Sequence, residues 1–123
     1  MFLNSIYSQP NDLNEKIDQG TLQRIFDQIH LPEIANATNE YRGLIPGCEI
    51  LIEVNNFVSE HDKFIIDEGV ACVVDKAIIF QLNQNYMRIE SIKKTDNKII
   101  VEVILINNNH KLIKRWQVSE KNK

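Results

Sequence analysis

The sequence predicts an α+β domain in which helices come first and a mainly antiparallel sheet follows. Three observations support this fold class. Apolar residues recur at helical spacing over residues 11–43, the period changes to two after Pro46-Gly47, and residues 97–107 form one run of branched apolar side chains. We therefore expect one domain over residues 1–123, with a helical part at 11–43 and a β-rich part at 48–118.

The run from Asn97 to Asn107 is the most informative stretch because both of its faces are apolar. One face carries Ile99, Val101, Val103 and Leu105, and the other carries Ile100, Ile104 and Ile106 with Glu102. A strand of this kind lies inside a sheet and is covered on both sides. Since the predicted helices cover one face, we expect the other to be covered by curvature towards a barrel or by a second copy in a homodimer.

Helices are predicted after an N-terminal arm at residues 1–10. Asp12, with Glu15 three residues later, resembles a capping box at the start of the first helix. Residues 21–30 repeat apolar side chains at spacings of three and four, which predicts an amphipathic helix. A third helical face ends at Gly43, a residue type that commonly follows a helix.

Shorter strands are predicted from the alternating stretches around the branched run. Residues 48–55 alternate on one face only, which indicates a strand nearer an edge of the sheet. The branched content of residues 70–82 favours two strands, 70–74 and 77–82, although the same residues also fit a helix. The remaining predicted elements are strands at 64–67, 86–94, 98–106 and 110–118, turns at 95–97 and 107–109, and a solvated tail at 119–123.

This order of helices followed by an antiparallel meander resembles the layout of the cystatin-like and nuclear-transport-factor-2-like folds, in which a curved sheet holds a helix in its palm. The resemblance covers about 110 residues and concerns element order. These folds host unrelated functions, so the resemblance implies a fold and no activity.

Composition places the chain among ordinary globular domains. It has 123 residues, of which 43% are hydrophobic and 25% charged. The N-terminus lacks the basic start and apolar core of a cleavable signal, so we expect a cytoplasmic protein. Cys48 and Cys72 lie in strand-like runs, which predicts buried free thiols in a reducing compartment rather than a disulfide.

The net charge of −3 conceals an uneven distribution. Residues 1–69 contain twelve Asp and Glu against four Lys and Arg, which is −8, whereas residues 70–123 contain five against ten, which is +5. Such asymmetry indicates an acidic protein-binding face or a basic nucleic-acid face, unless the two parts lie against each other and cancel.

The acidic part supports the leading hypothesis, a non-enzymatic domain that binds a protein partner, as inhibitors and immunity proteins do. Its candidate residues are Glu49, Glu53, Glu60, Asp62, Asp67 and Glu68. The basic part supports a less favoured alternative, the binding of single-stranded nucleic acid by cations and stacked aromatic rings. Its candidate residues are Tyr86, Arg88, Lys93, Lys94, Lys114, Arg115 and Trp116. A sequence pI of about 5.6 argues against this alternative.

Catalytic and metal-binding signatures are weak. His30 with Glu33, and Glu60-His61-Asp62, lack the convergent spacing of a zinc site. A general base at His61 requires a pocket, and the two cysteines have no histidine near them in the sequence. We therefore expect no cofactor and no metal. A small-molecule-binding or enzymatic domain, with a pocket between helices and sheet, ranks second to protein binding.

Overall fold

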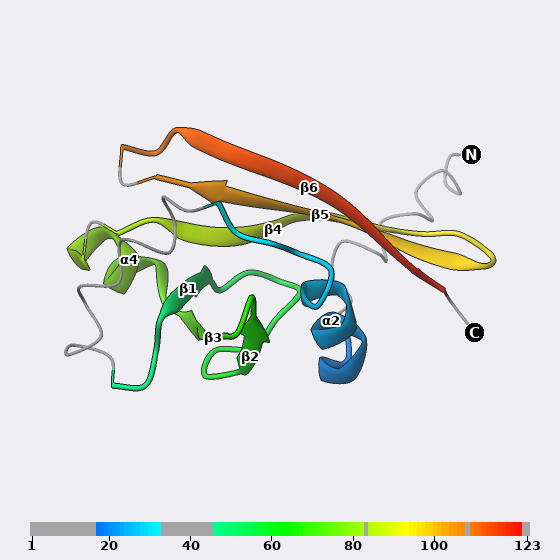
Figure 1. Ribbon diagram of the computed structural model, residues 1–123, viewed down its shortest axis with the longest axis horizontal. Coiled ribbons are helices and arrows are strands. Elements are labelled where there is room, and N and C mark those ends of the chain that lie inside the picture. The colour runs from blue at the N-terminus through cyan, green and yellow to red at the C-terminus, as the bar shows by residue number, and fades with distance from the viewer. Residues whose placement is uncertain (1–16, 33–45, 83, 108, 122–123) are drawn as a thin grey trace, which may run out of the picture.

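The computed structural model shows a mixed α+β fold with one curled sheet. The residues that it describes are 17–32, 46–82, 84–107 and 109–121. The helices in this part of the chain are α2 (Gln19–Phe26) and α4 (Lys76–Leu82). The strands are β1 (Ile50–Glu53), β2 (Lys63–Ile66), β3 (Gly69–Val74), β4 (Tyr86–Lys94), β5 (Lys98–Ile106) and β6 (Leu112–Lys121). Their order in the sheet is β2-β3-β1-β4-β5-β6 (Figure 1).

The antiparallel meander predicted for the C-terminal part is confirmed as β4-β5-β6. Its first turn is closed by the backbone N–H of Thr95, which donates to the carbonyl of Lys98 at 2.9 Å. The predicted tail at 119–123 is wrong in part, since residues 119–121 belong to β6 and pair with residues 98–100 of β5. The unbroken ladder along the start of β5 explains why the strand runs on.

The prediction that residues 48–55 lie near an edge of the sheet is wrong, because β1 is an interior strand. It runs parallel to both of its neighbours, with Ile52 opposite Val73 of β3 and Met87 of β4. The chain passes from β3 through α4 to β4 and so crosses β1, and such a crossover joins parallel strands. The sheet is therefore mixed, and its antiparallel meander is confined to β4-β5-β6.

The predicted strand at 77–82 is also wrong, because this segment forms α4. Its apolar residues Ile79 and Leu82 share one helical face and are buried. Asp75 precedes the helix, and its carboxylate accepts a hydrogen bond from the N–H of Ala77 at 2.9 Å. The helix covers the sheet face that carries Ile104, so the face is not left to a second subunit. The homodimer predicted for that reason stays a prediction.

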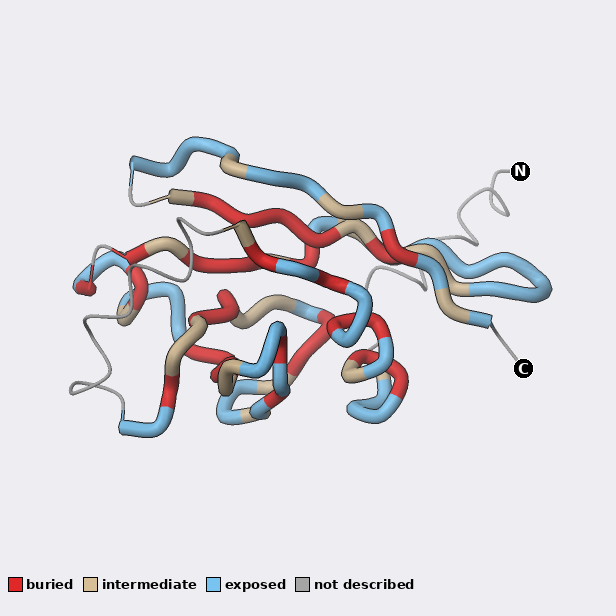
Figure 2. Tube along the Cα trace, viewed as in Figure 1, coloured by how far each residue is buried: buried red, intermediate tan, exposed pale blue. Residues whose placement is uncertain are grey.

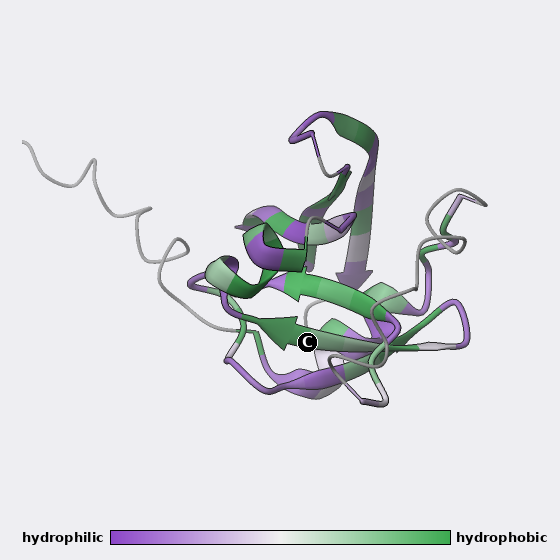
Figure 3. Cartoon of the chain, turned by 90° about the vertical axis from the view of Figure 1, so that its left-hand side faces the viewer, coloured by the Kyte–Doolittle hydropathy of each residue, from purple (hydrophilic) through white to green (hydrophobic). Residues whose placement is uncertain are grey.

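Two apolar cores lie on the two faces of the sheet, as the branched run of β5 predicts (Figure 2). The larger core lies under α2 and contains Leu22, Ile25, Phe26, Val101 and Val103. The smaller core lies under α4 and contains Cys48, Leu51, Cys72, Ile79, Leu82, Tyr86, Ile104 and Ile106, among others. Figure 3 shows the sheet curling, with hydrophobic strands in its interior and hydrophilic turns at their ends.

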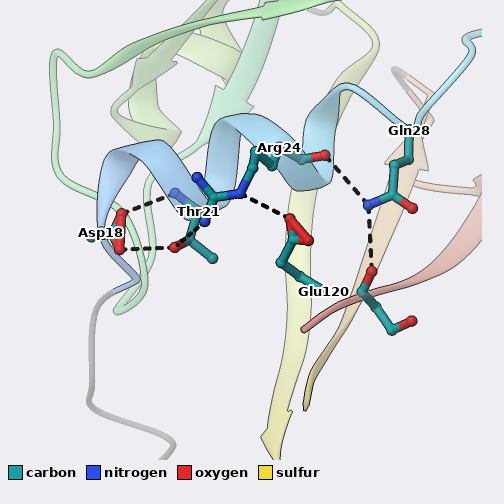
Figure 4. Close-up of polar contacts among 6 residues, drawn as sticks. Asp18, Thr21, Arg24, Gln28 and Glu120 are labelled. Atoms are coloured by element: carbon teal, nitrogen blue, oxygen red, sulfur yellow. Dashed lines mark hydrogen bonds and ion pairs between the residues drawn. The ribbon is translucent and has the colours of Figure 1, made fainter. Parts of the chain in front are cut away.

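Helix α2 begins at Gln19, two residues before the predicted start, because Asp18 caps it. One carboxylate oxygen of Asp18 accepts from the N–H of Thr21 at 2.9 Å and the other from the Thr21 hydroxyl at 2.8 Å (Figure 4). The helix ends at Phe26, and Ile29 stays buried after it. The predicted arm at 1–10, the capping box at Asp12 and the helical face ending at Gly43 lie outside the described residues.

The Asp18 cap makes helix stability depend on pH. Hydrogen bonds from Thr21 hold the pKa of Asp18 below its ordinary value of 3.8. Because the folded pKa is the lower one, the stabilisation is present above the unfolded pKa and is lost as pH falls through the folded pKa. Asp18→Ala is therefore expected to lower the urea midpoint at neutral pH, with the deficit shrinking below about pH 4. Asp18→Asn keeps a cap without a charge and serves as the control, and a deficit constant with pH would contradict the assignment.

Side chains of α2 contact both edge strands of the sheet. On one side, the Gln23 side-chain amide makes two hydrogen bonds to the backbone of Ile65 on β2. It donates to the carbonyl at 2.8 Å and accepts from the N–H at 2.9 Å. On the other side, Arg24 pairs with Glu120 of β6 at 2.9 Å (Figure 4). The helix therefore lies across the hollow of the curled sheet and joins its two edges.

The β2–β3 hairpin turns on Asp67 and Glu68, which both have positive φ, 52° and 70°. A two-residue turn of this kind prefers glycine at its second position, because a side chain there is strained. Glu68→Gly is expected to raise the free energy of unfolding by about 0.5–1 kcal/mol in urea titration. Glu60→Gly, at an exposed position without positive φ, should lower it. Equal effects of the two substitutions would contradict the turn geometry.

Candidate functional site

Charge is divided over the sheet in the same way as over the sequence. Residues 46–75, which carry β1, β2 and β3, contain seven Asp and Glu and one Lys, a net charge of −6. The described residues from 84 to 121, which carry β4, β5 and β6, contain eight Lys and Arg and four Asp and Glu, a net charge of +4. Because β1 and β4 are neighbours, an acidic half and a basic half of one sheet meet there (Figure 1).

The predicted protein-binding residues occupy two ends of the acidic half. Glu49, Asp67 and Glu68 lie where β1 begins, since Glu49 bonds Val70 next to the β2–β3 turn. The second group, Glu53, Glu60 and Asp62, lies where β1 ends. Glu49 and Glu53, four residues apart along the chain, are roughly 13 Å apart at the rise of an extended strand. The structure therefore gathers these six residues into two groups of three.

Three of the carboxylates hold the backbone in place. Glu49 accepts from the N–H of Val70 at 2.8 Å, and Asp62 accepts from the N–H of Ser59 at 3.2 Å. Asp67 accepts from the N–H of Leu31 at 3.1 Å. Such groups cost stability when removed, because their donors lose a partner. The carboxylates of Glu60 and Glu68 are exposed and make no such backbone contact in the described part of the chain.

Glu53 is the buried acidic residue of the set and lies at the boundary between the halves. It is 8% exposed, and its Oε1 lies 3.4 Å from Nε of Arg88 on β4. Arg88 also approaches Glu90, with 3.9 Å between Nη1 and Oε2. Burial lowers the pKa of Arg88, but the Glu53 carboxylate and the Tyr86 hydroxyl outweigh it, so the net pKa lies above its ordinary value. The facing Glu53 and Arg88 atoms have no hydrogen bond in the described structure, and charge attraction alone joins them.

The predicted nucleic-acid residues do not form one exposed surface. Tyr86 is buried in the smaller core, so its ring does not face solvent. Trp116 is half-buried against the larger core, with Nζ of Lys114 at 5.7 Å from its ring centroid. Lys93 and Lys94 are exposed near the β4–β5 turn, at the other end of the meander from the Leu105–Lys114 pair. Arg115 pairs with Glu102 at 3.5 Å.

The groups weighed for catalysis lie in different environments: the two thiols are neighbours in the core, whereas His30 and His61 are exposed, with His30 Nδ1 at 3.7 Å from a carboxylate oxygen of Asp67. Cys48 and Cys72 are buried free thiols, and burial together with the neighbouring Cys72 raises the pKa of Cys48 to about 12. A raised pKa keeps a thiol in its protonated form, which is a poor nucleophile. His61 is exposed in a turn with φ 78°. Over the described ranges, no group of three or more His, Cys, Asp or Glu side chains is arranged to hold a metal ion.

Sequence reasoning missed two features of the site. Asp75, which adds an exposed carboxylate to the acidic half, follows β3 directly and caps α4, so the signal was an acidic residue before an apolar helical face. The Glu53–Arg88 contact had no sequence signal, because a pairing between β1 and β4 depends on the crossover.

Comparison with known protein families, with curated protein sequences and with solved structures finds no match for this chain. Among the described residues, no helix is long and apolar enough to cross a membrane.

Proposed function

We propose that this domain is a non-enzymatic protein-binding module that engages a basic partner through the acidic half of its sheet. The observation that carries the proposal is the net charge of −6 on residues 46–75, which cover three adjacent strands. Opposite charge on a partner raises the rate of encounter and disfavours wrong partners. This is the behaviour expected of an inhibitor or immunity-type protein.

The basic half of the sheet does not cancel this charge. The two halves are neighbouring parts of one curled sheet, and Glu53–Arg88 is the described ion pair at their boundary. The exposed carboxylates Glu60, Glu68 and Asp75 therefore face solvent. They lie at both ends of the acidic half, so a partner that contacts them all covers the length of β1.

Two variants with the same change in net charge test where binding occurs. Glu60→Gln with Glu68→Gln raises the net charge by two and leaves the backbone contacts of Glu49, Asp62 and Asp67 intact. Asp96→Lys also raises it by two, but in the β4–β5 turn of the basic half. The probe is a fluorescent ten-residue peptide of alternating lysine and alanine, titrated by fluorescence anisotropy at low salt.

The first variant is expected to raise the Kd about five- to thirtyfold, since each of the two lost charge contacts at an exposed site is worth about 0.5–1 kcal/mol. The Asp96 variant should change the Kd less than twofold. Equal weakening by both variants would mean that only the overall charge matters and would overturn the proposal. So would the absence of binding at low salt. The same two variants then test any partner captured from the source cell.

A further inference from the structure

Side chains of α2 cover the two edge strands of the sheet, β2 and β6, to different extents. An edge strand presents unpaired N–H and C=O groups, and natural proteins commonly cover them. On β2, Gln23 occupies both groups of Ile65, and Gln19 donates to the carbonyl of Lys63 at 3.0 Å. The outer edge of β2 is thus closed by side-chain amides in place of a further strand.

Within the described ranges, side chains of α2 and the residues after it reach the edge of β6 at one end only. Gln28 donates to the carbonyl of Ser119 at 3.4 Å, so the backbone of Ser119 points away from β5. Backbone direction alternates along an antiparallel strand, which makes Gln117 and Arg115 point outward as well. No described residue bonds their outward N–H and C=O groups, and Figure 1 shows no described element beyond β6. Among the described residues, the part of this edge without a partner is Leu112–Gln117, which we call the open edge.

The side chains of this open edge are cationic and apolar. Lys111, Lys114 and Arg115 carry positive charge, and Leu112 is 52% exposed. A second copy is a poor occupant, because antiparallel alignment of the two open segments places Arg115 opposite or next to Arg115. Like charges directly opposite each other destabilise a strand pair. A strand that carries carboxylates has the complementary charge.

We propose that the open edge of β6 accepts an extended acidic segment of another protein as an added strand. The backbone of Arg115 and Gln117 pairs with the segment, and its carboxylates contact Lys114 or Arg115, which point to opposite faces of the sheet. Main-chain hydrogen bonds supply affinity in this mode of recognition, while the side chains select the sequence. This surface is separate from the acidic half and does not depend on the function proposed for it.

The probe is the peptide acetyl-Glu-Val-Glu-Val-Glu-Val-Glu-amide, titrated into the ¹⁵N-labelled full chain and followed by amide chemical shifts. Saturable shifts concentrated at residues 112–117 are expected. Two control peptides separate the effect of charge from that of backbone pairing. The first has lysine in place of every glutamate and tests charge, and the second keeps the charge but has N-methylated valines and tests backbone hydrogen bonding. Each should bind at least tenfold more weakly. Equal binding of the N-methylated peptide, shifts centred on β1 to β3, or no binding would overturn the proposal.

Protein variants provide an independent test. Arg115→Gln, which loses the charge and the side-chain contact with Glu102 of β5, is the control for Arg115→Pro. The proline variant additionally removes an outward N–H and no backbone hydrogen bond to β5, at a position where an edge strand tolerates proline. It is expected to weaken the peptide at least tenfold with an unchanged circular dichroism spectrum. If the proline variant unfolds the domain, the double variant Lys114→Gln with Arg115→Gln takes its place. Its control is Lys93→Gln with Lys98→Gln, which removes the same number of charges elsewhere on the meander. Equal loss in both pairs, or equal displacement of the peptide by an oligothymidine, would contradict strand addition.

Discussion

Replacing Val103 with aspartate is expected to abolish folding at 25 °C. Val103 is fully buried on β5, between β4 and β6 and under the core of α2. The carboxylate would lose its hydration and find no partner there, and the apolar contacts of valine would be lost as well. The combined cost exceeds about 4 kcal/mol. That approaches the whole stability of a domain at the lower end of the usual range of about 5–15 kcal/mol.

The measurement is a urea or thermal titration followed by circular dichroism. Lys98→Asp is the matched control, because it introduces the same residue into the same strand at an exposed position. The control should unfold cooperatively near the wild-type midpoint, whereas the Val103 variant should show no cooperative transition. A Val103 variant that melts within a degree or two of wild type would place β5 outside the core.

Removing one partner of the Glu53–Arg88 pair is expected to cost about 2–3 kcal/mol of unfolding free energy. Breaking a buried ion pair leaves the other charge desolvated and uncompensated, which typically costs about 3–5 kcal/mol. The Arg88 side chain is 29% exposed, so water reaches it and the smaller value applies. Glu53→Gln and Arg88→Gln should each show this loss in urea titrations.

The double variant should lose much less than the sum of the two single losses, because neither charge is then left alone. Arg115→Gln, which breaks the more exposed pair with Glu102, is the control and should cost less than about 1 kcal/mol. Additive losses at Glu53 and Arg88 would contradict a direct interaction between them.

The meander was predictable because its signal is local. The branched run of residues 98–106 identifies an interior strand without knowledge of its neighbours, and short polar turns join it to the strands before and after it. Residues 86–94 were assigned their observed bounds for the same reason. The cover over both faces of β5 was also predictable, since an apolar face requires one.

The segments predicted wrongly depend on distant contacts. Residues 77–82 fit a strand by branched content and a helix by spacing, and the need to cover Ile104 and Leu51 decides for the helix. Residues 48–55 alternate like an exposed strand because Glu53 counts as polar. The charge of Arg88 compensates the buried charge of Glu53, and the sequence of β1 alone does not predict this ion pair.

The candidate site follows the same division. The acidic and basic parts of the sequence become two halves of the sheet, as their charges suggest. Which carboxylates remain exposed was not predictable, since Glu49 is held by a backbone donor 21 positions away and Asp67 by one 36 positions away. The composition of the sequence predicts the sign of the surface charge, but the long-range pairing of the strands determines which carboxylates are exposed.

The division of the sheet into two charged halves rests on the contact between β1 and β4, and nuclear Overhauser effects measure it directly. A ¹³C,¹⁵N-labelled sample should show short-range effects between backbone protons of Ile52 and Met87, in the pattern of parallel strands. Ile52 should show the same pattern to Val73 on its other side. Effects that place β1 at an edge of the sheet, or beside β4 in an antiparallel pattern, would contradict the division and remove the basis of the Glu53–Arg88 contact.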